Sequence, residues 1–116
     1  MLVAAANITM WSAPWDIFGG YYSGKSLSVA AQDASPAGLA FSSDGTKVYV
    51  LGFEKVRVSQ YTLSTAWDIS TGSYASKSLS VSTQDETSQD LAFSPDGTKV
   101  YVLGDSNNRI YQYELI

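Results

Sequence analysis

The sequence contains no cysteine and no histidine. Without cysteine the chain has no disulfide bridge and no thiolate nucleophile, and without histidine it lacks imidazole bases and almost every zinc or haem site. Positive charge is scarce, because 7 Lys and Arg stand against 11 Asp and Glu and give a formal net charge of −4. Nucleic acids and anionic membrane surfaces bind clustered cationic faces, so we expect neither as a partner. No sequence motif indicates a cofactor.

Long hydrophobic runs are missing as well. No stretch approaches the roughly 20 apolar residues that a membrane-spanning helix needs. The uncharged opening, residues 1–14, has no Lys or Arg and is interrupted by polar residues, so it lacks the basic and apolar regions of a secretory signal. The chain does contain 45% hydrophobic residues over 116 positions, which is typical of one compact domain.

An internal repeat dominates the sequence. When the chain is aligned with itself at an offset of 52, residues 15–63 match residues 67–115 without gaps at 29 of 49 positions. The longest match is LAFSSDGTKVYVLG at 39–52 against LAFSPDGTKVYVLG at 91–104, which differ only where Pro95 replaces Ser43. Repeats of roughly 40–50 residues are typical of β-propellers and related arrays.

Each repeat shows the periodicity of β-strands. Polar and apolar residues alternate in SLSV, VYVL is a run of β-branched and aromatic residues, and no helix cap precedes a helical pattern. The pairs Asp44-Gly45 and Asp96-Gly97 indicate tight hairpin turns. The pattern predicts four strands in each repeat, at about 25–31, 38–42, 47–52 and 57–63 and again at 77–83, 90–94, 99–104 and 109–115.

The strand VYVL places apolar side chains on both faces of its sheet, because successive side chains point to opposite sides. Each sheet must therefore be covered on two sides. The segment FSPDGTKVYVLG resembles the hairpin of β-propeller repeats of the YVTN and WD type. This resemblance implies an all-β fold with two four-stranded antiparallel propeller blades, at 15–63 and 67–115, in which the strands at 25–31 and 77–83 are innermost.

Two blades do not close a ring, since propellers typically have four to eight. We therefore expect the chain to associate with itself head to tail, as a homotrimer with six blades or a homotetramer with eight. Residues 1–14 are a spare segment, which we expect to form an extra strand at the seam between copies. The rival fold is a monomeric sandwich in which two four-stranded sheets face each other.

Trp15-Asp16 and Trp67-Asp68 form the first candidate ligand site. An exposed indole beside a carboxylate suits sugars, because the ring covers C–H edges and the carboxylate accepts hydrogen bonds from hydroxyl groups. A glycan is therefore the expected ligand. The alternative is that each tryptophan anchors the linker between blades while each aspartate caps a turn.

Asp33 and Asp85 are the candidate metal ligands. Each lies shortly after the strand expected to be innermost, so the symmetry of a ring would gather their carboxylates near its axis. Oxygen ligands in such an arrangement suit a hard cation. The alternative is that both carboxylates cap turns.

These features favour a non-enzymatic binding or scaffold module, an oligomeric propeller that binds carbohydrate through the Trp-Asp pairs. Two alternatives come from other classes. One is a purely structural surface or phage-associated repeat protein. The other is a propeller hydrolase, because proteins of this resemblance include lactonase-like enzymes. Without histidine its base would have to be Asp, Glu, Lys or Tyr with a shifted pKa, and no residue stands out as catalytic.

Overall fold

A computed structural model describes residues 14–116 as an all-β protein, which confirms the predicted fold class at this level. Apart from Pro14, the segment expected to add an extra strand, 1–14, lies outside the described residues. Within 14–116 the chain forms seven strands and one short 3-10 helix, η1: β1 Pro36–Phe41, β2 Lys47–Gly52, β3 Arg57–Leu63, η1 Ile69–Thr71, β4 Gly72–Ser80, β5 Ser88–Phe93, β6 Lys99–Gly104 and β7 Arg109–Glu114.

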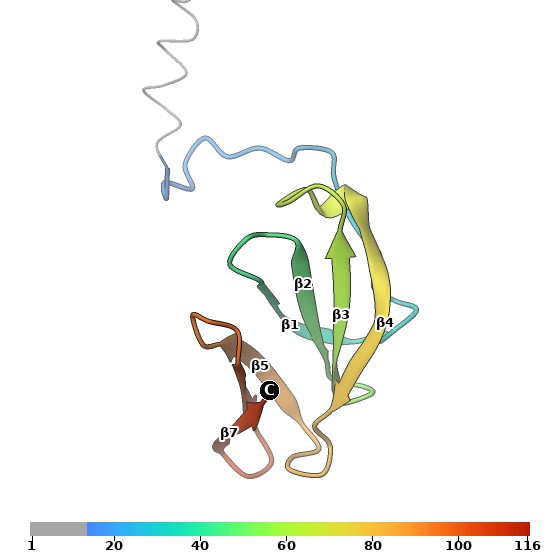
Figure 1. The fold of residues 1–116 in the computed structure, drawn as a ribbon, viewed down its shortest axis with the longest axis vertical. Coiled ribbons are helices and arrows are strands. Elements are labelled where there is room, and N and C mark those ends of the chain that lie inside the picture. The colour runs from blue at the N-terminus through green and yellow to red at the C-terminus, as the bar shows by residue number, and fades with distance from the viewer. Residues whose placement is uncertain (1–13) are drawn as a thin grey trace, which may run out of the picture.

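The strands form two antiparallel sheets that lie beside each other (Figure 1). The first sheet has the order β1-β2-β3-β4 and the second has the order β5-β6-β7. The edge strands β1 and β5 contact each other across the boundary. The prediction of two four-stranded sheets is therefore right for the first sheet only, because among the described residues the second sheet has three strands.

The segments predicted as innermost strands lie elsewhere. β4, which includes residues 77–80, pairs with β3 at the outer edge of the first sheet, and residues 25–31 form no strand. Alternating polar and apolar residues indicate a strand but do not indicate its partner. The first sheet therefore spans residues 36–80, which is offset from the sequence repeat at 15–63.

The hairpins β1–β2 and β5–β6 turn as the Asp-Gly pairs predict. In the first, one carboxylate oxygen of Asp44 accepts hydrogen bonds from the Ser42 hydroxyl (2.8 Å), the Thr46 backbone N–H (3.0 Å) and the Thr46 hydroxyl (2.7 Å). Asp96 makes the same three contacts in the second hairpin. Gly45 and Gly97 both have φ of +74°, which a residue without a Cβ atom adopts at little cost.

The main core lies between the two sheets, and its position follows from the alternation of β2 and β6. Leu51 of β2 packs against Val100 and Val102 of β6, and all three side chains are buried. Val48, on the other face of β2, is also buried, and there Leu27 and Val29 pack against its cluster. Both faces of β2 are thus covered, as its sequence requires. None of the secondary structure in residues 14–116 is a helix long and apolar enough to cross a membrane.

Candidate active site

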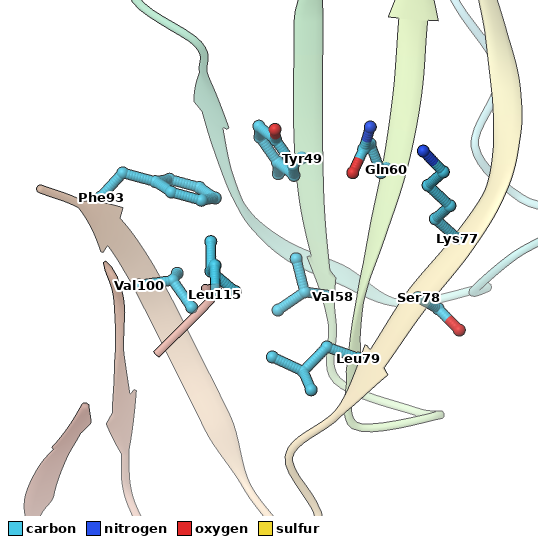
Figure 2. A pocket seen from close by; sticks show the side chains of 9 residues that line it. All are labelled: Tyr49, Val58, Gln60, Lys77, Ser78, Leu79, Phe93, Val100 and Leu115. Atoms are coloured by element: carbon cyan, nitrogen blue, oxygen red, sulfur yellow. The ribbon is translucent and has the colours of Figure 1, made fainter. Parts of the chain in front are cut away.

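A cleft of about 250 Å³ opens between the two sheets. Its floor is apolar and comes from β3, β4 and β6, whereas its rim carries polar groups from neighbouring strands (Figure 2). The full lining is Tyr49, Val58, Gln60, Lys77, Ser78, Leu79, Phe93, Val100 and Leu115. A mostly apolar hollow with a few convergent polar groups is the usual form of a small-molecule site.

Tyr49 is the central aromatic residue of the cleft. Its ring packs against Phe93 of the second sheet at a centroid distance of 4.4 Å, so the pair joins the two sheets. Burial, and to a lesser extent the negative charge of Asp44, raises the pKa of the Tyr49 phenol above its usual value of 10.0. The hydroxyl group therefore stays protonated at neutral pH and can donate a hydrogen bond.

Gln60 and Lys77 supply the other polar groups on this side. They lie opposite each other in the register of β3 and β4, so both side chains leave the same face of the first sheet. In Figure 2 both rise beside Tyr49, whereas the neighbouring Ser78 hydroxyl points away from that ring. This difference follows from the alternation of side chains along a strand.

A second hollow, of about 450 Å³, adjoins the first and shares Tyr49 and Phe93 with it. The two hairpin turns line it, including Asp44 and Asp96. Hydrogen bonds from the backbone and side chain of Thr46 lower the pKa of Asp44 to about 2, and Thr98 has the same effect on Asp96. Both carboxylates are therefore ionised at neutral pH, and each is a weak base.

The Trp67-Asp68 pair forms the turn between β3 and β4. The Trp67 backbone N–H donates to the Gly45 carbonyl (2.9 Å), and its indole packs on Phe41 at a centroid distance of 5.2 Å. Asp68 caps η1 by accepting from the Ser70 N–H and pairs with the Lys25 ammonium at 2.9 Å. Hydrogen bonds from Ser70 and Lys25 lower the Asp68 pKa. In these contacts Trp67 anchors the turn and Asp68 caps η1, which are the alternative roles that the sequence left open.

Trp15-Asp16 has a different environment from its repeat counterpart. Trp15 is fully exposed, although its backbone φ of +67° is close to the +64° of Trp67. Asp16 accepts a hydrogen bond from the Phe18 N–H at 3.0 Å, as Asp68 does from Ser70. The ligand-binding role of the four Trp and Asp residues stays a prediction.

Asp33 and Asp85 hold the segments that lead into β1 and β5 against the β2–β3 and β6–β7 loops through backbone contacts. Asp33 is buried and accepts hydrogen bonds from the backbone N–H groups of Ser35 (2.8 Å), Glu54 (3.3 Å) and Lys55 (2.6 Å). Burial by itself raises the Asp33 pKa, but the hydrogen bonds outweigh it and the net pKa is lowered. Asp85 accepts equivalent bonds from Thr87, Ser106 and Asn107.

No group of three or more Asp or Glu side chains in residues 14–116 is arranged to hold a metal ion. The oxygens of Asp33 and Asp85 are already engaged by N–H donors within the chain. A metal site formed by these two residues across several copies of the chain stays a prediction.

No sequence motif marks Tyr49, Gln60 and Lys77 as site residues. All three are identical in the other repeat, where their counterparts are Tyr101, Gln112 and Lys25, and this identity is the signal that could have indicated them. It was not sufficient, because the cleft depends on β4 pairing with β3, which the sequence did not predict.

Comparison with known proteins identifies a fold. No protein-family model matches the chain, and no curated protein matches it by sequence. Among solved structures it is similar to a candidate 6-phosphogluconolactonase from Bacteroides uniformis, with a TM-score of 0.55 and 18% sequence identity. The match covers 84% of this chain and 28% of that protein. The chain thus spans about a quarter of the length of this structural neighbour.

This match corrects the leading functional prediction. The sequence favoured a non-enzymatic module that binds carbohydrate at the Trp-Asp pairs, with no enzymatic activity. The structural neighbour is named as a lactonase, so the finding favours the hydrolase alternative over that prediction. The absence of histidine counted against an enzyme, but a lactone can also be activated by donors such as tyrosine and lysine.

Proposed function

We propose that this chain contributes blades of the YVTN and WD type to a β-propeller hydrolase that opens a sugar lactone in the cleft beside Tyr49. The observation that carries the proposal is the structural match to a candidate 6-phosphogluconolactonase over 84% of the chain. The apolar floor and polar rim of the cleft support it, since a sugar ring presents both apolar and hydroxyl surfaces.

The proposed reaction is hydrolysis of a cyclic ester. Water adds to the carbonyl carbon, the bond from that carbon to the ring oxygen breaks, and the ring oxygen takes up a proton to give the hydroxy acid. Negative charge develops on the carbonyl oxygen as water adds. The neutral Tyr49 hydroxyl and the Lys77 ammonium are the donors that would stabilise this charge, and Gln60 would orient the substrate.

Asp44 and Asp96 would act as hydrogen-bond acceptors in the second hollow, which adjoins the cleft. Because each has a pKa of about 2, they would hold substrate hydroxyl groups or the attacking water rather than remove a proton completely. Lys47 lines the same hollow and is the cation available there for a phosphorylated substrate.

The test is ring opening of 6-phosphogluconolactone and of unphosphorylated gluconolactone, followed by acid release in a weakly buffered indicator assay. We expect the full chain to exceed the uncatalysed rate. Tyr49→Phe and Lys77→Met should each lower kcat by roughly 100-fold, the effect of removing one oxyanion donor. A preference for the phosphorylated substrate that is lost in Lys47→Met would assign the phosphate to that side chain.

Ser73→Ala is the matched control, because Ser73 is an exposed residue of the same strand as Lys77 but lines neither hollow. It should retain activity within about twofold, and thermal melts should show that all variants fold. A rate equal to the uncatalysed reaction, or an equal loss in Ser73→Ala, would contradict the proposal.

A further inference from the structure

We propose that β7 binds residues 15–28 of a second copy of this chain, so that the copy supplies the fourth strand of the second sheet. The two sheets occupy equivalent positions in the repeat, yet only the first is complete among the described residues. This interaction surface is inferred independently of the proposed enzymatic activity, and its test measures association rather than turnover.

The free edge of β7 is the counterpart of an edge that is already filled. β3 binds β4 along the full strand, from Arg57 opposite Ser80 to Leu63 opposite Gly72. At the offset of 52, β7 corresponds to β3, and the counterpart of β4 is residues 20–28. No described residue pairs with the outer edge of β7. An edge with unpaired backbone groups is a template for strand addition.

The repeat also predicts the register of the new pairing. Val58 lies opposite Leu79 in the first sheet, so Ile110 should lie opposite Leu27 of the second copy. Tyr61 lies opposite Tyr74, with ring centroids 5.6 Å apart, so Tyr113 should meet Tyr22 of the second copy in the same way. Tyr22 and Ile110 are both exposed in the single chain.

Residues 15–28, which we call the donor segment, already have positive φ values at the positions where this pairing needs them. In the first sheet the register shifts at Gln60 and Tyr61, and Ser76 of β4 has a φ of +60° at this irregularity. Its counterpart Gly24 has a φ of +81°. The two tryptophans that precede the strands, Trp15 and Trp67, also share a positive φ. These two positions thus already have backbone φ values close to those of their counterparts, which lowers the cost of binding.

The donor segment also lies on the face of the first sheet that a second copy would approach. Leu79 of β4 and Val81, which directly follows β4, pack in the core cluster between the two sheets, which includes Val100 of β6. Their counterparts Leu27 and Val29 pack in the same way against the cluster around Val48. Residues 25–29 therefore lie on the first sheet where the outer strand of a preceding sheet would lie, and the second sheet of another copy can join them there.

Exposed apolar side chains mark both sides of the same seam. Leu51 is 0% exposed and Val58 is 6% exposed, whereas their counterparts Leu103 and Ile110 are 43% and 71% exposed. Leu91 is 6% exposed and its counterpart Leu39 is 62% exposed. Tyr101, Leu103 and Ile110 line an apolar hollow of about 180 Å³ on the second sheet. Each exposed residue has a buried counterpart at the contact between the two sheets of one chain.

The surface over Gly97 on the second sheet corresponds to the surface that Trp67 covers on the first sheet. In the first sheet the indole of Trp67 covers Gly45 so closely that a Cβ atom there would meet the ring. At the counterpart Gly97, a Cβ atom would have no heavy atom of residues 14–116 within 4 Å. Because Trp15 is fully exposed, we assign it to Gly97 and Phe93 of the second copy, as Trp67 covers Gly45 and Phe41.

The contact is head to tail, so it forms a ring when the rotation per chain divides a full turn and otherwise an open filament. Each chain supplies two sheets, and three or four chains complete a ring of six or eight. The mass by light scattering should therefore be three or four times 12.5 kDa. Trp15→Ala should shift the mass toward one chain, whereas Trp67→Ala should lower the Tm without changing the assembly.

Cysteine cross-linking tests the register, because the natural chain has no cysteine. The double variant Leu27→Cys/Ile110→Cys should form a disulfide ladder on a non-reducing gel that ends at three or four chains. Val58→Cys/Leu79→Cys should form the same bond within one chain and calibrates the geometry. The variant Ser26→Cys/Ile110→Cys places its cysteines on opposite faces and should yield at least tenfold less ladder.

Three results would overturn the proposal. The first is a monomeric mass for the natural chain at high concentration, which would mean that the β7 edge does not bind a second copy. The second is an equal ladder from the Ser26 variant. The third is an oligomer whose mass is unchanged by Trp15→Ala. Because the first and third measurements do not need the cysteine variants, a double variant that fails to fold leaves the test intact.

Discussion

Asp44 and Asp96 act as electrostatic clamps on the two hairpin turns. Each accepts three hydrogen bonds with its carboxylate, and each pKa is lowered from 3.8 to about 2. A folded-state pKa below the unfolded value means that the ionised form stabilises the fold. This contribution is complete above pH 3.8 and is lost as the pH falls toward 2.

We therefore expect the free energy of unfolding to fall between about pH 4 and pH 2, and Asp44→Asn/Asp96→Asn to flatten this dependence. Urea unfolding curves at half-unit steps from pH 2 to pH 6 would measure it. Asp16→Asn is a control, because the hydrogen bond that Asp16 accepts within residues 14–116 comes from a single backbone N–H group, that of Phe18. If the double variant and the natural chain give parallel pH curves, the clamps do not carry the acid sensitivity.

At the same scale, the sequence predicts residue roles that depend on local structure better than roles that depend on neighbours. The turn function of Asp44-Gly45 follows from two adjacent residues, and the structure confirms it. Gln60 and Lys77 become part of one cleft only because β4 returns to pair with β3. Nothing local distinguishes them from other polar strand residues.

At the scale of elements, the hairpins of the two repeats have the same turn, but within residues 14–116 a tryptophan ring packs over the first turn and not over the second. Gly45→Ala and Gly97→Ala both place a Cβ atom at a φ of +74°, which costs roughly 1–2 kcal/mol. Gly45→Ala also drives that atom into the Trp67 ring, whereas Gly97→Ala meets open space in the single chain. We expect Gly45→Ala to lose about 1–3 kcal/mol more of the free energy of unfolding than Gly97→Ala.

Chemical denaturation in dilute solution, where the single chain is populated, would measure this difference. Gly97→Ala should in addition weaken self-association, because the added methyl group would occupy space that the Trp15 indole of another copy needs. Equal losses for the two variants in dilute solution would mean that the Trp67 ring moves aside freely, and the indole would then contribute little to the hairpin.

The same contrast explains why strand positions were predicted well and sheet boundaries poorly. Residues 25–29 and 77–81 share the sequence KSLSV. Of the two segments, 77–81 begins inside a described strand, because β3 lies beside it. A repeating sequence defines the period of a structure but not the residue at which a sheet starts. That choice is made by backbone pairing, which involves residues far apart in the chain.

At the scale of the whole molecule, no strand within residues 14–116 pairs with the outer edge of β7, and residues 15–28 form no strand. The apolar residues Leu39, Leu103 and Ile110 are exposed on the surfaces that the repeat places in contact. A group of exposed apolar side chains of this kind indicates an interface with another protein. The predicted trimer or tetramer thus has a specific seam, formed by β7 and residues 15–28.

Association through this seam should make thermal stability depend on protein concentration, because the assembled form is favoured by mass action. We expect the Tm to rise by several degrees for each tenfold increase in concentration, since a tenfold change corresponds to about 1.4 kcal/mol and each 1 kcal/mol shifts the Tm of a small domain by roughly 4–8 °C. Ile110→Lys should abolish the dependence, because it buries an ammonium against Leu27. Ser43→Lys adds the same charge at an exposed hairpin position and should leave the dependence intact. A Tm of the natural chain that stays constant over a hundredfold range would show that the seam does not form.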